Sequence, residues 1–281
     1  MLTLPDPTSP VLDAIRRVVA ELAAKVPGLD LDAVMLVGAQ CRDVLHVGLG
    51  HAFGTRSSFD VDLGLALRSW DDHREVTQAC GAPGANGIQY RVAGLPVDLL
   101  PFGEVEEPAG LVTPPERKEA LSVWAFAEVY QESRSLPLGG SLHLRIPTVP
   151  GYAAIKLAAW LDRSAYGQYK DAVDLALVML WYRNHEGMLD RLYEQHPEVM
   201  ADYDYDLTLA AAALLGMDAM QVVGAARAAE LRARWPRTSR ALEELAGELR
   251  PSGDEALPVE ERLPRARRLE LAAALADGLF R

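Results

Sequence analysis

The hydrophobic pattern of the sequence changes within the proline-containing stretch 136–150. Before this stretch, short β-rich runs alternate with helical segments, a pattern that predicts a mixed sheet flanked by helices. After it, the long segments are rich in alanine and follow a helical period. We therefore predict an α+β fold with two domains, in which residues 1–147 form the sheet-containing domain and residues 148–281 form an all-helical domain.

The first half also shows where individual elements are expected. Ser9 and Ser69 precede helical patterns and are predicted to cap them. A two-residue turn at Ala93-Gly94 predicts a hairpin. Strands are predicted over 33–38, 57–67, 87–103 (as that hairpin), 122–130 and 141–147, and helices over 11–26, 39–50 and 69–80.

The composition excludes several classes of protein. The 281 residues include 28 Lys and Arg and 40 Asp and Glu, a net charge of −12, which disfavours nucleic-acid binding through a broad basic surface. Cys41 and Cys80 are the only cysteines, too few for a disulfide scaffold or a structural zinc site. The first ten residues do not resemble a signal peptide, and we expect the apolar stretches to be too short to span a bilayer. We expect a cytoplasmic protein with no membrane partner.

Asp60-Val61-Asp62 is the most informative short motif. On a strand, residues two apart project to the same face, so both carboxylates are expected to point the same way. Aspartate is a poor strand former and the like charges repel, whereas a divalent cation such as Mg²⁺ would remove the conflict. Asp98 is a third acid on a strand predicted to lie nearby. The alternative interpretation of all three is a solvated strand face and a turn.

Residues upstream of these acids fit a phosphate-binding region. Gly38-Ala39 follows a predicted strand and opens a predicted helix, whose N-terminus favours anions. Arg56 and Ser58 precede Asp60 and are candidates for nucleotide binding. For Arg56, a surface loop arginine is the alternative interpretation.

The order of these motifs resembles the nucleotidyltransferase (DNA polymerase β-like) superfamily. The motifs are Gly38-Ala39, the run from Arg56 to Asp62, and Val97-Asp98-Leu99. Lys156 and Lys170-Asp171 resemble the abortive-infection (AbiEii-like) branch of type IV toxin–antitoxin nucleotidyltransferases. The resemblance covers about residues 33–185 and implies a nucleotidyltransferase-like sheet domain.

The resemblance also implies roles for single residues. Asp60 and Asp62 would hold two Mg²⁺ ions that bridge a nucleoside triphosphate (NTP), and Asp98 would complete the metal site and help to deprotonate the attacking hydroxyl. Gly38 and the amides near Ala39 would bind phosphate, although Ala39 stands where the family pattern often has serine. Lys156 would contact the triphosphate, and Asp171 or Asp174 would match a late acidic position.

Simpler explanations exist for the residues of the helical half. Lys156 could extend its ammonium from an apolar helix face to solvent. Lys170, Asp171 and Asp174 could form a solvated, ion-paired helix face. Two groups of arginines could line an RNA groove, but solvated helix surface is the commoner explanation; they are Arg227, Arg232, Arg234, Arg237 and Arg240, and Arg262, Arg265, Arg267 and Arg268.

Three functional hypotheses follow. The first is a Mg²⁺-dependent enzyme that transfers a nucleoside monophosphate from an NTP to an acceptor hydroxyl, with a tRNA end as acceptor and a cognate antitoxin as partner. The second is a non-catalytic nucleotide-binding or partner-binding module of the same fold. The third is a nucleotidyltransferase that modifies a cationic small molecule of the antibiotic type.

Overall fold

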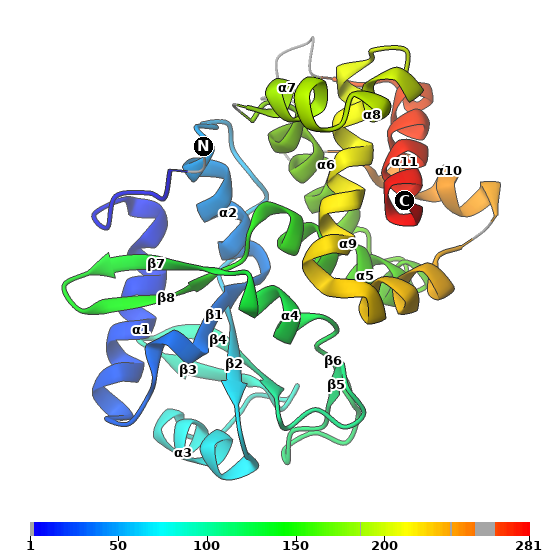
Figure 1. Ribbon diagram of the computed structural model, residues 1–281. Helices are drawn as coiled ribbons and strands as arrows, with labels where there is room; N and C mark the ends of the chain where they lie inside the picture. The colour runs from blue at the N-terminus through cyan, green and yellow to red at the C-terminus, as the bar shows by residue number, and fades with distance from the viewer. Residues whose placement is uncertain (1–2, 186, 237, 251–261) are drawn as a thin grey trace. The chain divides into compact units, whose positions relative to one another are not determined.

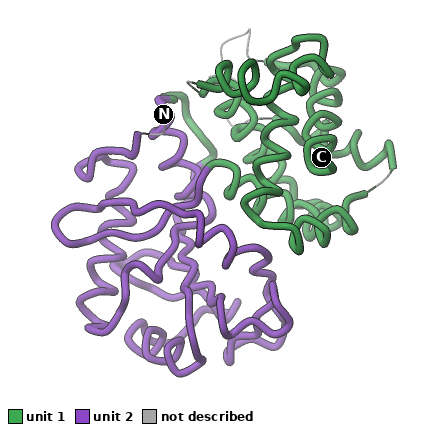
Figure 2. The backbone as a smooth tube through the Cα atoms, in the orientation of Figure 1, with its two compact units in different colours: residues 1, 51–56, 149–281 green, residues 2–50, 57–148 purple. Residues whose placement is uncertain are grey.

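The computed structural model describes residues 3–185, 187–236, 238–250 and 262–281. The chain divides into two compact units (Figure 2). One, the α/β unit, comprises Leu2–Gly50 and Ser57–Thr148; the other, the helical unit, includes His51–Arg56 and Val149–Arg281. The boundary between Thr148 and Val149 lies one residue beyond the predicted boundary. Residues 51–56 belong to the helical unit, although in the sequence they lie between the two parts of the α/β unit.

The α/β unit is built on a mixed six-stranded sheet (Figure 1). Its strands lie in the order β3-β4-β2-β1-β8-β7, with β2 parallel to β4 and β1 parallel to β8. Their bounds are β1 Val34–Val37, β2 Val61–Leu67, β3 Gln89–Val92, β4 Leu95–Gly103, β7 Arg134–Gly139 and β8 Leu142–Ile146. A separate pair, β5 Leu111–Val112 and β6 Leu121–Ser122, is antiparallel.

Four α-helices and two short 3₁₀ turns complete this unit. The α-helices are α1 Asp13–Lys25, α2 Gly38–Gly48, α3 Trp70–Cys80 and α4 Phe126–Gln131, and the 3₁₀ turns are η1 Pro10–Leu12 and η2 Leu31–Ala33. Helix α1 packs on α3 and on β8, whereas α2 packs on β1 and β2. Ile15, Val18 and Leu22 on α1 are at most 1% exposed, so one apolar stripe of this helix closes the core.

The helical unit contains the remaining elements. They are α5 Val149–Arg163, η3 Ser164–Tyr166, α6 Lys170–Arg183, α7 Met188–Asp190, the π-helical turn η4 Arg191–Gln195, α8 Pro197–Asp202, α9 Leu207–Arg234, α10 Ser239–Glu248 and α11 Arg265–Phe280. Helix α9 lies at the centre and packs on α5, α6, α8 and α11. The structure thus confirms a mixed α/β arrangement with a sheet, followed by C-terminal helices.

Several predicted elements are confirmed. The hairpin turns at Ala93 and Gly94, which both have positive φ, and pairs Val92 with Leu95. Ser69 caps α3 through a reciprocal capping box with Asp72. The structure also buries four tryptophans and the Cys41 side chain; the tryptophans are Trp124, Trp160, Trp181 and Trp235.

Other predictions are wrong. The segment 122–130 is not a strand: after the two-residue β6, the chain turns at Ala125, which has a φ of 61°, and forms α4. Residues 57–60 precede β2 rather than belonging to it. Ser9 precedes the 3₁₀ turn η1 rather than α1, and its side chain makes no cap hydrogen bond. Strand β7 was not predicted from the sequence, because Pro137 and the glycines that follow it are typical of a linker.

Helix α9 corrects the expectation about apolar length. By length and composition it could cross a membrane, although 56% of its most apolar window is buried within the protein. The core helix of a soluble protein passes the same test, so this is weak evidence. Gly224, at φ 75° and ψ 170°, interrupts the helical backbone of α9.

Two glycines let α9 and α11 approach closely. A Cβ at Gly278 would lie 1.9 Å from the carbonyl oxygen of Ala213, and one at Gly216 would lie 2.5 Å from that of Leu275. Both obstacles are backbone atoms, which cannot rotate away. A side chain at either position would therefore force the helices apart.

We expect Gly278→Ala to lower the free energy of unfolding by at least about 1–3 kcal/mol, because the added methyl overpacks a backbone contact. Gly247→Ala is the matched control, since that helical glycine has open space around it and alanine favours helices. Urea denaturation followed by circular dichroism would measure both. Equal effects of the two substitutions would contradict the close-contact explanation.

Candidate functional site

Asp62 and Asp98 occupy directly paired positions on the parallel strands β2 and β4. Paired residues of neighbouring strands project to the same face, with backbones about 4.8 Å apart. Their flanking pairs, Val61 with Val97 and Leu63 with Leu99, are fully buried on the other face. The two half-buried carboxylates are thus held side by side by the register of the sheet.

This placement is unfavourable without compensation, because like charges directly opposite one another destabilise a sheet. The Nε2 of Gln89, from β3, donates a hydrogen bond of 3.2 Å to Oδ1 of Asp98. Gln89 is also paired in register with Asp98, so three adjacent strands contribute to one polar row. The row is the core of the candidate site.

Gly38 leaves the space that the Asp62 carboxylate fills. The residue has a φ of 65°, and a Cβ there would lie 1.8 Å from Oδ2 of Asp62. It is also the first residue of α2, directly after Val37, which pairs with Asp62 across β1 and β2. The carboxylate therefore lies against the first turn of a helix, at the positive end of its dipole. Glycine is required here both by backbone conformation and by contact.

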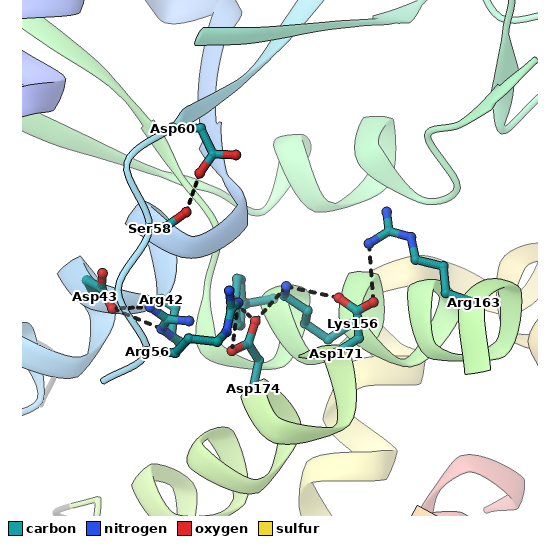
Figure 3. Close-up of polar contacts among 10 residues, drawn as sticks. Arg42, Asp43, Arg56, Ser58, Asp60, Lys156, Arg163, Asp171 and Asp174 are labelled. Atoms are coloured by element: carbon teal, nitrogen blue, oxygen red, sulfur yellow. Dashed lines mark hydrogen bonds and ion pairs between the residues drawn. The ribbon is translucent and has the colours of Figure 1, made fainter. Parts of the chain in front are cut away.

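Asp60 lies just before β2, and its Oδ1 accepts a short hydrogen bond from the hydroxyl of Ser58 (Figure 3). Gln40 of α2 donates through Nε2 to the backbone oxygen of Ser58 at 3.4 Å. The side chain of Phe59, between Ser58 and Asp60 in the sequence, is 84% exposed. Ser58 therefore positions Asp60. Ala39, which the sequence predicts to lie near bound phosphate, is buried in the first turn of α2.

The predicted metal site is assembled only in part. Within the portion of the chain that the structure describes, no three Asp, Glu, His or Cys side chains gather closely enough to hold a metal ion. The sheet brings together two of the three predicted carboxylates, Asp62 and Asp98. Two carboxylates suit Mg²⁺, which takes one or two from a protein and completes its shell with water and substrate phosphates.

A second polar cluster lies within the helical unit, around Lys156 of α5. Its Nζ is 2.7 Å from Oδ2 of Asp174 and 3.1 Å from Oδ1 of Asp171, both on α6 (Figure 3). The lysine side chain is 8% exposed and both carboxylates are fully buried. We call Lys156, Asp171 and Asp174, with the groups that contact them, the buried ion network.

Two arginines and a tyrosine extend the network. Nη1 of Arg163 lies 3.2 Å from Oδ2 of Asp171, and Nη2 of Arg56 lies 3.9 Å from Oδ1 of Asp174. The hydroxyl of Tyr152 donates to Asp174 at 3.3 Å. Both arginine side chains are more than a third exposed, so the network is buried at its centre and reaches solvent at two ends.

These positions correct the simpler interpretation of the helical residues. Asp171 and Asp174 do not form a solvated face, because both are fully buried, and the Lys156 ammonium does not reach solvent. Arg56 is a member of the buried ion network rather than an isolated loop arginine. Tyr152 and Arg163 were not predicted, although Tyr152 stands one helical turn before Lys156 and Arg163 eight residues before Asp171.

The proton of Lys156 is held firmly. Burial lowers the pKa of this amine, but the charges of Asp174 and Asp171 and their hydrogen bonds outweigh burial and raise the pKa above the ordinary 10.5. The ion pairs of Lys156 therefore stabilise the folded state fully at any pH below the pKa that this amine has in the unfolded chain. This contribution is lost only as the pH rises through the higher pKa of Lys156 in the folded state. At neutral pH Lys156 is a cation.

Four of the eight described arginines in the two arginine groups form ion pairs, and Arg232 and Arg268 donate to backbone carbonyls of Leu279 and Ala246. Arg227 pairs with Glu230, Arg234 with Asp162, and Arg240 with Glu244. Arg267 contacts Asp206 and Glu270, whereas Arg237 lies outside the described residues. These pairs favour ion-paired helix surface over an RNA groove.

Comparisons with protein-family models, curated proteins and solved structures found no match for this chain.

We expect Gly38→Ala to destabilise the α/β unit more than Gly94→Ala does, by at least about 1 kcal/mol in the free energy of unfolding. Both positions have positive φ, so both substitutions carry the same kind of backbone strain. Gly94 has nothing within 4 Å of its added Cβ, whereas Gly38 meets the Asp62 carboxylate. Chemical denaturation of the two variants measures the difference; equal losses would contradict the contact.

We expect Lys156→Met to cost about 3–5 kcal/mol in the free energy of unfolding, because it leaves two buried carboxylates without their shared cation. Lys25→Met is the matched control, since Lys25 also contacts a carboxylate at 2.7 Å but on the surface of α1. That control should change stability by no more than about 1 kcal/mol. Urea titrations would compare them, and similar small losses would show that the buried ion network is not a structural core.

Proposed function

We propose that this chain is a Mg²⁺-dependent nucleotidyltransferase, which transfers a nucleoside monophosphate from an NTP to an acceptor hydroxyl. The observation that carries the proposal is the in-register pair Asp62 and Asp98, lying beside the glycine that opens α2. The resemblance of the motifs to the nucleotidyltransferase superfamily supports the same assignment.

The donor set fits the metal that this chemistry uses. Asp62 and Asp98 offer hard carboxylate oxygens on one face of the sheet. Asp60, two residues before Asp62, is the third acid in the proposal and is held in place by the hydroxyl of Ser58. When bound there, Mg²⁺ would neutralise phosphate charge and stabilise the attacking and leaving oxygens of the displacement. The first turn of α2 at Gly38 and Ala39 favours a phosphate group through its dipole.

The reaction requires the acceptor oxygen to attack the α-phosphorus while the bond to the β-phosphate oxygen breaks and pyrophosphate leaves. Asp98 accepts the proton of the acceptor hydroxyl in this proposal, and Gln89 holds its Oδ1 in place. Most of the acceleration comes from position and charge rather than covalent chemistry by the protein. The roles that the resemblance implies for Lys156 and Asp174 stay predictions, as do a tRNA acceptor, an antitoxin partner and a cytoplasmic location.

The experiment is a transfer assay with labelled NTPs, Mg²⁺, and RNA or cationic small molecules as acceptors. We expect Asp62→Asn and Asp98→Asn each to lower transfer at least about 10²-fold, the scale of losing a group that acts on charge in the transition state. Asp71→Asn is the control, because that carboxylate is 83% exposed on α3 and contacts only Arg74 among the ion pairs described.

The outcomes separate the hypotheses. Transfer to RNA supports the toxin-like assignment, and transfer to a cationic small molecule supports the antibiotic-type alternative. Mg²⁺-dependent nucleotide binding without transfer to any acceptor would contradict catalysis and leave a nucleotide-binding module. Transfer that survives both aspartate substitutions would contradict the site.

A further inference from the structure

The loop between α5 and α6 exposes two aromatic side chains within four residues. Tyr166 is 81% exposed and Tyr169 is 51% exposed. Gly167 between them has a φ of 71°. A Cβ at Gly167 would lie 3.6 Å from the hydroxyl oxygen of Tyr169. Exposed tyrosine rings offer flat apolar surface to a partner. We call residues 163–170 the tyrosine loop.

Cations flank these rings, whereas the neighbouring carboxylates are already engaged. Arg163 opens the loop with a side chain that is 41% exposed, and Lys170 closes it at an exposed position. Asp171 is fully buried against Lys156 and Arg163, and Asp162 is paired with Arg234. Residues 163–170 thus contain two cations, two tyrosines and no carboxylate, on a protein whose net charge is −12, and Arg163 stays partly exposed although it contacts Asp171.

The buried ion network holds both ends of the loop. Arg163 at the end of α5 contacts Asp171 in the first turn of α6, and Lys156 joins the same carboxylate from α5 (Figure 3). The backbone amides of Gly167 and Gln168 donate to the carbonyls of Ser164 and Arg163. The rings are thus presented from a fixed frame, which lowers the entropy lost on binding.

We propose that the tyrosine loop is a binding surface for single-stranded nucleic acid, with bases stacked on Tyr166 and Tyr169 and phosphates near Arg163 and Lys170. Aromatic platforms interleaved with cations are the usual means of binding single strands, and they tolerate any base. This inference rests on the proposed function, for which it names RNA as the class of acceptor. An acidic peptide is the other partner that such a surface could attract.

The test uses the full chain and fluorescence anisotropy with 5′-labelled 12-nucleotide oligo(A) and oligo(U), without NTP. Tyr166→Ala combined with Tyr169→Ala should raise the Kd for both oligonucleotides at least about tenfold, whereas the two Phe substitutions should retain binding because the ring faces remain. Tyr193→Ala is the matched control, since Tyr193 is 53% exposed elsewhere in the helical unit. Lys170→Ala should weaken both oligonucleotides alike and reduce the salt slope by about one.

Magnesium-dependent NTP binding is measured on the same preparations, so that the two proposals fail separately. Normal NTP binding with no RNA binding, or RNA binding that the double alanine variant retains, would overturn the tyrosine loop while leaving the proposed function intact. Preferential binding of a labelled poly-glutamate peptide would also overturn it. Absence of Mg²⁺-dependent NTP binding in the wild-type protein would instead count against the proposed function.

Discussion

The alignment of two aspartates on paired strands is the constraint on which the candidate site depends. The sheet register sets Asp62 beside Asp98, and the missing side chain of Gly38 leaves room for the Asp62 carboxylate. Strand pairing alone would disfavour this pair of charges. The fold nevertheless keeps the two carboxylates together, flanked by fully buried apolar pairs and beside the first turn of α2.

The helical unit handles buried charge in a different way. Lys156 compensates Asp171 and Asp174 directly, and Arg56 and Arg163 complete the cluster at its solvent-facing ends. Taking these charges from water is costly, and hydrophobic replacements of whole buried ion clusters are often as stable. We therefore attribute to the network a role in fixing the geometry of α5, α6 and the loop between them, beyond a contribution to stability.

The sequence predicts the elements whose signals are local. Alternation, the Ala93-Gly94 turn and the Ser69 cap each specify their element without distant contacts. The Asp60-Val61-Asp62 motif lies at the start of β2, where Asp62 is paired with Asp98. What it misses depends on tertiary structure. Segment 122–130 is apolar enough for a strand or a helix, and only packing decides. Contacts between residues distant in sequence bury Asp174 beside Lys156. Such contacts also place residues 51–56 in the helical unit.

The central claim is that Asp62 and Asp98 together bind Mg²⁺ with a nucleotide. Isothermal titration calorimetry with a non-hydrolysable NTP analogue, in the presence of Mg²⁺ and then of EDTA, tests it most directly. The account predicts that Mg²⁺ strengthens analogue binding to the wild-type protein and that Asp98→Asn abolishes this strengthening while the fold, checked by circular dichroism, is retained. Analogue binding that is the same with and without Mg²⁺, or a metal effect that Asp98→Asn preserves, would contradict it.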